Sequence, residues 1–224
     1  MNEREILITD GELQLPGTLR MPEHPLGIVL FAHGSGSSRF SSRNRRVAAA
    51  LANEGFATVL FDLLTAREEQ IDERTRQLRF DIGLLASRLI AATDWIGAQS
   101  AAGDLPIGYF GASTGAAAAL VAASTMPAVR AVVSRGGRPD LAGKALPAVR
   151  AATLLIVGGA DPVVLDLNRR ALGQLQAEKK LEIVPGATHL FEEPGALDVV
   201  IALAARWYGR FLGAGSAEQR AAAR

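Results

Sequence analysis

The chain has 224 residues, of which 49% are hydrophobic and 21% charged, and these proportions are ordinary for one soluble globular domain. The formal net charge of +1 argues against a nucleic-acid-binding surface, and the absence of cysteine excludes disulfides, thiolate metal sites and a cysteine nucleophile. The first ten residues lack the apolar core of a secretory signal, and no apolar stretch approaches the roughly 18 residues of a membrane span. We therefore expect one cytoplasmic domain over residues 1–212 that binds neither membrane nor nucleic acid.

Short apolar runs alternate with amphipathic stretches along the chain. The first two runs are joined near Asp10-Gly11, a dipeptide typical of a hairpin turn. Several later runs, such as GIVLFA at 27–32, are apolar without interruption, as expected for strands buried on both faces. The predicted strands are residues 4–9, 12–20, 27–32, 56–61, 107–110, 128–134, 151–157 and 181–184. The predicted helices are residues 41–54, 78–99, 114–123, 166–177 and 195–211.

The alternation predicts an α/β fold with an eight-stranded, mostly parallel sheet, an antiparallel first hairpin and helices on both faces. Residues 64–77 are dense in charge, and we interpret them as a solvated, mobile surface segment in preference to a binding loop. Residues 135–150 have room for one short helix and no cap domain. Residues 213–224 are small and charged and are expected to be disordered. In such a sheet the chemistry gathers beyond the carboxyl ends of the strands.

One of these strand ends carries a candidate nucleophile. The apolar run at 107–110 leads through G-A-S-T-G at 111–115 into a stretch of small helix formers. A strand that turns sharply into a helix strains the residue at its apex, needs small neighbours there and exposes the apex hydroxyl. The helix N-terminus behind that residue suits a developing oxyanion. The G-x-S-x-G pattern is weak by itself, but in this strand–turn–helix setting it predicts that Ser113 is a nucleophile.

A serine nucleophile needs a base, and the chain has three histidines. His24 precedes its strand and is predicted to be a surface loop residue. His33 and His189 both follow strands at the carboxyl edge. His189 comes late in the Ser–Asp–His order that such an elbow uses, so we predict it as the base. His33 is expected to support the glycine-rich loop at 33–38.

A carboxylate must hold the imidazole in the right tautomer. Asp161 directly follows the seventh predicted strand, in a G-G-A-D-P sequence whose glycines let the loop turn toward His189. Asp140 follows the sixth strand and is a usable alternative, while Asp166 looks like a helix N-cap. We favour Asp161 on the expected strand order.

Backbone N–H groups beside Ser113 are candidates to hold the oxyanion. We expect the donors to be the N–H groups of Thr114 and Ser35, with the choice within the glycine-rich loop open by one position. His33 and Gly34 of the same loop are expected to line the substrate site.

Three arginines are placed to line the same edge. Arg39 and Arg43 follow the glycine-rich loop, and Arg135 ends a predicted strand. If two of them converge, an anionic acyl group is indicated; the alternative is that each pairs with a surface carboxylate. The site is expected to be open, with walls partly formed by residues 63–77 and 35–43.

Together these residues resemble the α/β-hydrolases over nearly the whole chain. The His-Gly pair after the third strand, the serine elbow after the fifth, Asp161 after the seventh and His189 after the eighth are in family order. The phrases AHGSGSSR at 32–39 and VPGATH at 184–189 are similar to dienelactone-hydrolase-related proteins. The resemblance implies an α/β-hydrolase fold and a Ser–His–Asp hydrolase that needs no metal or organic cofactor.

One departure limits what the resemblance implies. Dienelactone hydrolases proper use cysteine as nucleophile, whereas residue 113 here is serine. Their substrate is therefore not carried over, and a simple carboxylic ester is the expected substrate. Some bacterial members of the group occur beside or fused to phosphoribosyltransferase domains.

The sequence thus predicts a cap-less serine hydrolase that cleaves small carboxylic esters through an acyl-enzyme. The same triad would serve a thioesterase or an acyltransferase, and the fold also allows a non-catalytic binding protein. A small-molecule ester is the expected partner, and the chain is expected to be a monomer or a homodimer.

Overall fold

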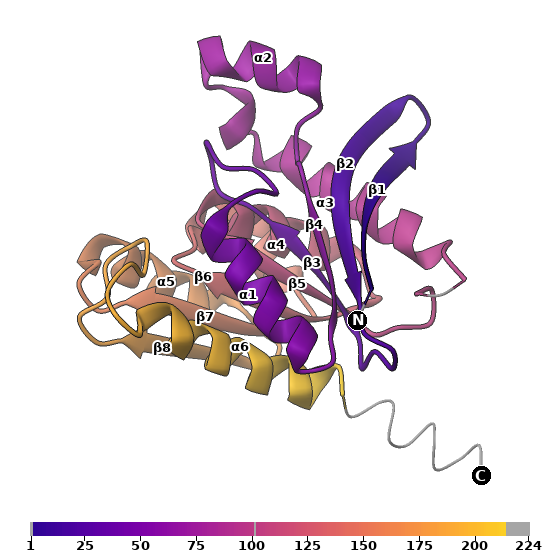
Figure 1. Cartoon of the computed structure of the whole chain (residues 1–224). Helices are drawn as coiled ribbons and strands as arrows, with labels where there is room; N and C mark the ends of the chain where they lie inside the picture. The colour runs from indigo at the N-terminus through magenta and orange to yellow at the C-terminus, as the bar shows by residue number, and fades with distance from the viewer. Residues whose placement is uncertain (1, 101, 214–224) are drawn as a thin grey trace.

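The computed structural model describes residues 2–100 and 102–213. These residues build one mixed sheet of eight strands (Figure 1). The strand order is β1-β2-β4-β3-β5-β6-β7-β8; the β1–β2 and β2–β4 pairs are antiparallel and the others parallel. The strands are β1 (Asn2–Asp10), β2 (Leu13–Met21), β3 (Ile28–Ala32), β4 (Ala57–Phe61), β5 (Ile107–Ala112), β6 (Val129–Arg135), β7 (Ala152–Gly158) and β8 (Lys179–Val184). The predicted fold class is confirmed. Except for Gly213, the tail predicted at 213–224 lies outside the described residues.

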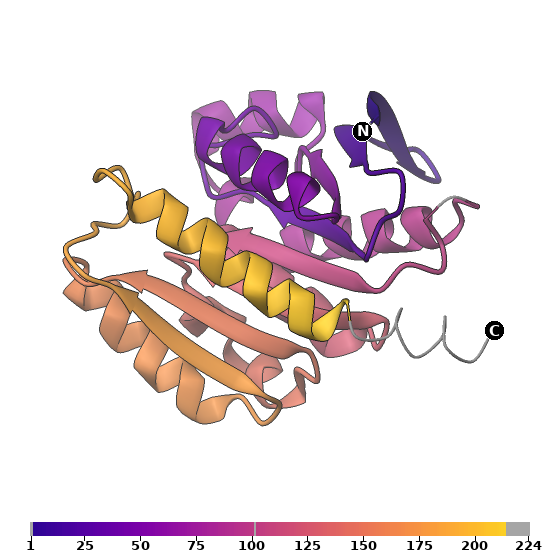
Figure 2. The same ribbon diagram turned by 60° about the horizontal axis from the view of Figure 1, so that its bottom comes forward.

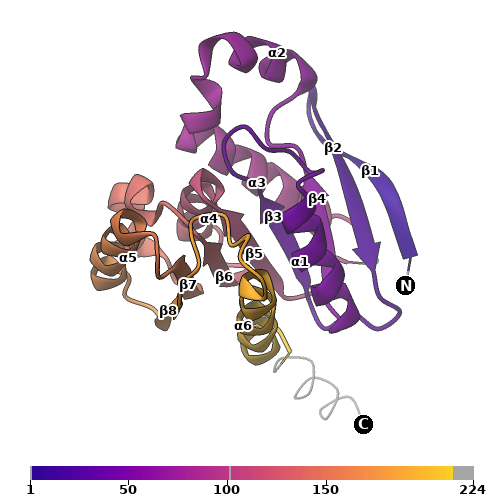
Figure 3. The same ribbon diagram turned by 60° about the vertical axis from the view of Figure 1, so that its left-hand side comes forward.

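Helices cover both faces of the sheet. Apolar side chains of α1 (Ser42–Asn53) and α6 (Ala196–Phe211) share one buried cluster, and these two helices lie side by side over the sheet (Figure 2). The opposite face carries α3 (Ile82–Gly97), α4 (Thr114–Thr125) and α5 (Pro162–Gln174), whose apolar side chains form a second cluster (Figure 3). Every residue of β3, β4 and β5 is buried, because the sheet is covered on both sides.

Close packing of α6 fixes β5, the strand that leads into the candidate nucleophile. A Cβ at Gly108 would lie only 2.8 Å from the Tyr208 ring, so glycine there lets α6 approach the sheet. The Tyr208 hydroxyl donates to the carbonyl oxygen of Tyr109 at 2.7 Å. The strand β5 is therefore held by its neighbouring strands and by a helix packed on its first half.

The charge-dense segment after β4 is a helix whose residues are mostly exposed, so it is solvated as predicted, but its helical structure was not predicted. Helix α2 (Ala66–Thr75) begins with a capping box in which Thr65 and Glu68 bond each other's backbone N–H groups. Asp72 is buried and forms an ion pair with Arg79. Figure 1 shows α2 standing above the sheet, away from the layers of helices that cover it.

Two predicted helices begin at other residues than expected. The helix predicted over 78–99 is interrupted by a short 3₁₀ turn, η1 (Leu78–Phe80), after which Asp81 caps α3 by accepting the Leu84 N–H. The helix predicted over 166–177 begins at Pro162, because Asp161 and not Asp166 is its N-cap.

The connection after β6 agrees with the prediction of no cap domain. It consists of a tight turn and a 3₁₀ segment, η2 (Pro139–Ala148), which lies against α4 and α5. Nothing in this connection extends over the carboxyl edge as a separate layer (Figure 3). Among the described residues, no helix is both long enough and apolar enough to cross a bilayer.

Candidate active site

Ser113 lies at the junction of β5 and α4, with φ 51° and ψ −122°. A residue with a side chain rarely adopts these angles, and surrounding contacts must hold it there. The Ser113 N–H donates to the carbonyl oxygen of Arg135 (N···O 3.3 Å), and its own carbonyl oxygen accepts the Arg138 N–H (3.1 Å). The strained turn is therefore held by the end of β6 and the residues that follow it.

Two glycines let other segments pack directly against this turn. A Cβ at Gly115 would lie 2.2 Å from the carbonyl oxygen of Ala32, so only glycine lets α4 begin this close to β3. A Cβ at Gly34 would lie 3.1 Å from the Cβ of Ser113, which brings the glycine-rich loop next to the serine. These contacts explain why the turn has small residues on both sides.

His189 and Asp161 come together as the sequence predicts. The His189 Nδ1 lies 2.8 Å from Asp161 Oδ2, and Asp161 Oδ1 accepts the Val164 N–H at 3.4 Å. The Asp161 side chain is 16% exposed and the His189 side chain 37%, so the carboxylate lies below the imidazole and the imidazole reaches solvent. One carboxylate therefore orients the histidine and caps α5.

The histidine loop meets the serine turn at the end of β6. A Cβ at Gly136 would lie 2.9 Å from the His189 carbonyl oxygen and 3.6 Å from its Nδ1. Gly136 directly follows Arg135, whose carbonyl oxygen holds the Ser113 N–H. The loops that carry Ser113 and His189 thus pack on the same short piece of backbone.

The competing carboxylate is engaged elsewhere. Asp140 accepts two hydrogen bonds from Arg138, from Nε at 2.9 Å and from Nη2 at 2.8 Å. Asp166 pairs with Arg170 one turn along α5. Of the three aspartates considered from sequence, Asp161 is the one that contacts His189.

The expected oxyanion donors lie next to each other. The Ser35 N–H donates to the Thr114 hydroxyl oxygen at 2.9 Å, which ties the glycine-rich loop to the first residue of α4. Thr114 is buried, and its N–H belongs to the first turn of α4, where backbone N–H groups have no partner within the helix. The structure therefore brings Ser35 and Thr114 together, but the Ser35 N–H is already hydrogen-bonded to the Thr114 hydroxyl.

His33 supports its loop, as the sequence predicts. Its Nε2 accepts the Leu63 N–H at 3.2 Å, so Nδ1 carries the proton that faces the Gly34 carbonyl oxygen at 3.0 Å. Burial lowers the pKa of His33, so the ring is neutral at pH 7. The third histidine, His24, is exposed, as expected.

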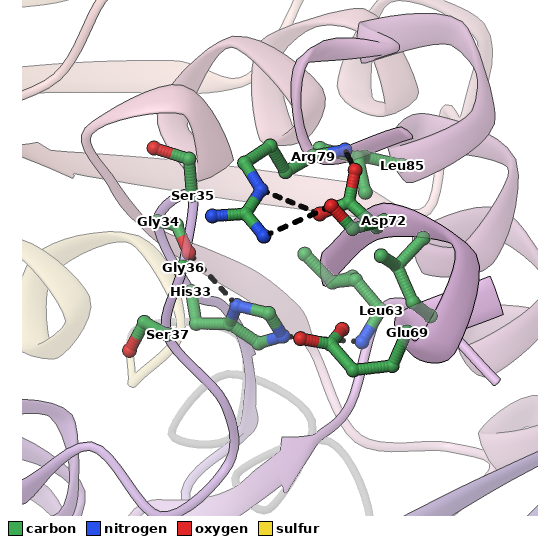
Figure 4. Close-up of a pocket in the computed structure, with 11 residues that line it drawn as sticks. His33, Gly34, Ser35, Gly36, Ser37, Leu63, Glu69, Asp72, Arg79 and Leu85 are labelled. Atoms are coloured by element: carbon green, nitrogen blue, oxygen red, sulfur yellow. Dashed lines mark hydrogen bonds and ion pairs between the residues drawn. The ribbon is translucent and has the colours of Figure 1, made fainter. Parts of the chain in front are cut away.

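A small pocket lies between the glycine-rich loop and the α2 segment (Figure 4). His33 and loop residues 34–37 form one side, while Glu69, Asp72 and Arg79 form the other. Burial and the nearby Asp72 raise the pKa of Glu69. The two segments expected to wall the site, residues 35–43 and 63–77, therefore both contribute to this pocket. The three charged residues were not predicted, because a charge-dense stretch gives no sign of which side chains turn inward.

The arginines expected to line the site differ in their surroundings. Arg39 forms ion pairs with Asp62 and Glu5 and stacks on Phe40, so its guanidinium is committed to the β1–β2 side of the molecule. The structure does not bring Arg39 into the pocket beside the glycine-rich loop.

Arg135 is buried and its guanidinium lacks an acceptor. Its Nε and Nη1 have no hydrogen-bond partner among the described residues, and the guanidinium lies 6.0 Å from the ring centre of Phe191, two residues after His189. Burial, with a contribution from Arg43, lowers the pKa of Arg135 to about 10. Arg43 pairs with Glu192 at 2.7 Å, and its own Nε is also buried with no partner in the part of the chain that the structure describes. Arg43 and Arg135 thus lie near each other beside the histidine loop, and the exposed carboxylate of Glu192 pairs with Arg43.

The chain is similar to known proteins over most of its length. Residues 15–213 match the dienelactone hydrolase family. A dienelactone hydrolase from Anabaena variabilis is 59% identical, with a TM-score of 0.92, and the match covers 94% of this chain and 98% of that one. The esterase domain of a Rhodothermus marinus protein is 19% identical with a TM-score of 0.74, covers 95% of this chain and 100% of that one, and shares the fold.

A longer relative carries a different name. The chain is 58% identical over 209 residues to a Mycobacterium tuberculosis protein named "Putative phosphoribosyl transferase". The match covers 93% of this chain and 46% of that protein, so the chain spans about half the length of the curated relatives it matches. The family model over residues 15–213 and the relative at 59% sequence identity both indicate the same family for this chain. The chain belongs to the dienelactone hydrolase family of the α/β-hydrolase superfamily.

Proposed function

We propose that this chain is a serine hydrolase that cleaves small carboxylic esters. The observation that carries the proposal is the 2.8 Å contact between His189 and Asp161, on a loop that packs against Gly136, the residue after the one whose carbonyl oxygen holds the strained Ser113. A base oriented by a carboxylate next to a serine at an elbow is the arrangement that activates a hydroxyl nucleophile.

In this mechanism Ser113 Oγ attacks the ester carbonyl carbon while His189 Nε2 takes the hydroxyl proton. Asp161 accepts the Nδ1–H bond and stabilises the imidazolium that forms. The tetrahedral intermediate collapses, and the alkoxide leaves with the proton from His189, so an alcohol departs and an acyl-enzyme remains. Water then attacks the acyl carbon with His189 as base, which releases the carboxylic acid and restores Ser113.

The oxyanion is assigned to the backbone N–H groups of Thr114 and Ser35. The N-terminus of α4 adds its partial positive charge at the same place. Because the Thr114 hydroxyl accepts the Ser35 N–H, the oxyanion competes with this hydroxyl for the second donor. A charged oxygen is the stronger acceptor and a hydroxyl rotates readily, so the exchange favours the oxyanion.

Hydrolysis is favoured over transfer to another acceptor by the exposure of the base. The His189 side chain is 37% exposed, and the connection after β6 builds no cap above it. Water therefore reaches the nitrogen that must activate it in the second half of the reaction.

The test is the intact mass of the protein after exposure to a fluorophosphonate, with the Ser113→Ala variant as control. We expect one phosphonyl adduct on the natural chain and none on the variant, because the reagent reacts with an activated serine. No adduct on the folded natural chain would contradict the mechanism and would favour a non-catalytic binding role.

Within this function, the surroundings of Arg135 favour esters that carry a negative charge on the acyl part. A buried cation without an anion is costly, and an acyl carboxylate would supply the missing acceptor. We expect kcat/KM to be about tenfold higher for mono-p-nitrophenyl succinate than for p-nitrophenyl butyrate, equivalent to about 1.4 kcal/mol.

The Arg135→Met variant should remove this preference while Arg20→Met, which changes an arginine paired with Glu3 at the far edge of the sheet, should keep it. If the ratio of kcat/KM for the two esters is the same in the natural chain and in Arg135→Met, then Arg135 does not recognise the charge on the acyl part.

A further inference from the structure

One fully buried polar side chain lies between the two halves of the proposed triad. Asn168, on α5, has no exposed surface. Its Nδ2 donates to the carbonyl oxygen of Gly137 at 2.9 Å and to that of Val164 at 2.8 Å. The first bond crosses from α5 to the turn after β6, and the second stays within the first turns of α5.

The chemistry of the two acceptors fixes which way the amide points. Both neighbours of Nδ2 are carbonyl oxygens, and a carbonyl oxygen only accepts. If the amide were reversed, Oδ1 would face two acceptors and both contacts would become repulsive. The Oδ1 has no partner among the described residues. The side chain is therefore retained in an apolar layer for its two donors, even though its acceptor goes unused.

The turn that Asn168 holds is itself locked to the nucleophile. A Cβ at Gly137 would lie 1.9 Å from the Ser134 Oγ and 2.6 Å from the Cβ of Ala116 in α4, so this glycine is enclosed by the strand and the helix. The next residue, Arg138, donates its N–H to the Ser113 carbonyl oxygen at 3.1 Å. Movement of the turn would therefore move the backbone of Ser113.

On its other side Asn168 is connected to the carboxylate. The carbonyl oxygen of Val164 accepts from Asn168, and the N–H of Val164 donates to Asp161 Oδ1 at 3.4 Å. Asp161 Oδ2 in turn lies 2.8 Å from His189 Nδ1. Hydrogen bonds, joined by the Gly137–Arg138 peptide and by the backbone of Val164, thus lead from the backbone of the nucleophile through the Asn168 amide to the acid.

We infer that Asn168 is a positioning residue that sets where Asp161 and His189 stand relative to Ser113. It touches no reacting atom. It acts by fastening the first turn of α5, which carries the acid, to the turn that holds the serine. The inference rests on the proposed function for its effect on catalysis, while its effect on the contact between His189 and Asp161 does not depend on that function.

The test compares Asn168→Leu with Thr93→Val. Leucine has nearly the shape of asparagine but donates nothing. Thr93 is also buried, on α3, where its hydroxyl bonds the Leu89 carbonyl oxygen at 2.8 Å and the Tyr109 hydroxyl at 2.6 Å. Valine therefore removes two buried hydrogen bonds, as Asn168→Leu does, but on a helix other than the one that carries Asp161. For Asn168→Leu we expect kcat on p-nitrophenyl butyrate to fall by about 10- to 100-fold, because small displacements of catalytic groups cost this much, with KM changed by less than about threefold.

A spectroscopic measurement separates positioning from a loss of stability. The low-field proton NMR signal of the His189 Nδ1–H reports its bond to Asp161. It should shift or disappear in Asn168→Leu and stay unchanged in Thr93→Val, although both variants lose unfolding free energy. An unchanged signal together with a kcat within about twofold of Thr93→Val would overturn the inference.

Asn168→Ser keeps the test valid if the leucine variant does not fold. A serine hydroxyl can bond back to the Val164 carbonyl oxygen but is too short to reach Gly137. This variant therefore removes the hydrogen bond between α5 and the turn after β6 but keeps the bond within α5. We expect the same fall in kcat and the same change in the NMR signal as for Asn168→Leu. If the natural chain forms no fluorophosphonate adduct, the proposed function fails, and the NMR signal of the variants still decides the role of Asn168.

Discussion

Replacing Asp161 by Asn should lower kcat for ester hydrolysis by about 10³- to 10⁴-fold. The amide has no charge to stabilise the imidazolium, and its NH₂ group can present a donor to His189 Nδ1, which selects the wrong tautomer. Asparagine caps helices as well as aspartate does, so α5 keeps its N-cap and the free energy of unfolding should change little. Steady-state kinetics and urea unfolding of the same variant separate the two duties of this carboxylate.

The matched control is Asp140→Asn. Asp140 bonds Arg138 and lies on the other candidate loop, so its loss should change kcat by less than about threefold. Equal losses in the two variants would show that the acid had been assigned to the wrong strand.

Replacing Gly115 by Ala should lower the free energy of unfolding by about 3 kcal/mol or more, or prevent folding. The new Cβ would lie 2.2 Å from the carbonyl oxygen of Ala32 and 2.5 Å from that of His33. Both obstacles are backbone atoms of β3 and of the residue after it, in the middle of the sheet, so neither can move aside.

Gly173→Ala on α5 supplies the comparison for this variant. No atom lies within 4 Å of a Cβ built at Gly173, and alanine favours the helix by up to about 1 kcal/mol. We therefore expect urea denaturation to show a large loss for Gly115→Ala and a small gain for Gly173→Ala. A Gly115→Ala protein as stable as the natural chain would mean that α4 can withdraw from β3.

The parts of the site that could be predicted are those that follow from local sequence and strand order. A buried strand followed by G-x-S-x-G predicts that the chain turns sharply at Ser113. Parallel strands carry their following residues to the same edge, which was enough to place Asp161 with His189. Both inferences need only the order of elements and not the details of their packing.

The wall over residues 63–77 was predicted, but which of its side chains turn inward could not be. In a run of alternating acids and arginines, nothing in the composition distinguishes Asp72, which is buried, from its exposed neighbours. Its burial depends on Arg79, which reaches back across the turn after α2. The one readable signal was the capping box of Thr65 and Glu68, which marks a helix start.

The arginines show the same limit. Arg39 and Arg135 both stand at strand or loop ends near the active edge. Arg39 pairs with Asp62 and Glu5, whereas Arg135 has no acceptor within residues 2–100 and 102–213. Which carboxylate meets which guanidinium is decided by side-chain geometry across distant segments. The start of α5 was misplaced for a related reason, since Asp161 caps the helix as well as holding His189.

The attachment of α2 has a consequence for how this scaffold can diverge. Its anchors are ion pairs, between Asp72 and Arg79 and between Glu68 and Arg88, and Asp72 is its one buried residue. The proposed triad residues come from other connections, after β5, β7 and β8. Helix α2 itself can therefore change length and sequence without disturbing the sheet. The residues before it cannot, because the Leu63 N–H bonds His33 and both Leu63 and Leu64 lie in the core. The pocket wall that α2 forms and the proposed triad therefore come from separate stretches of the chain, so one can be exchanged while the other is kept.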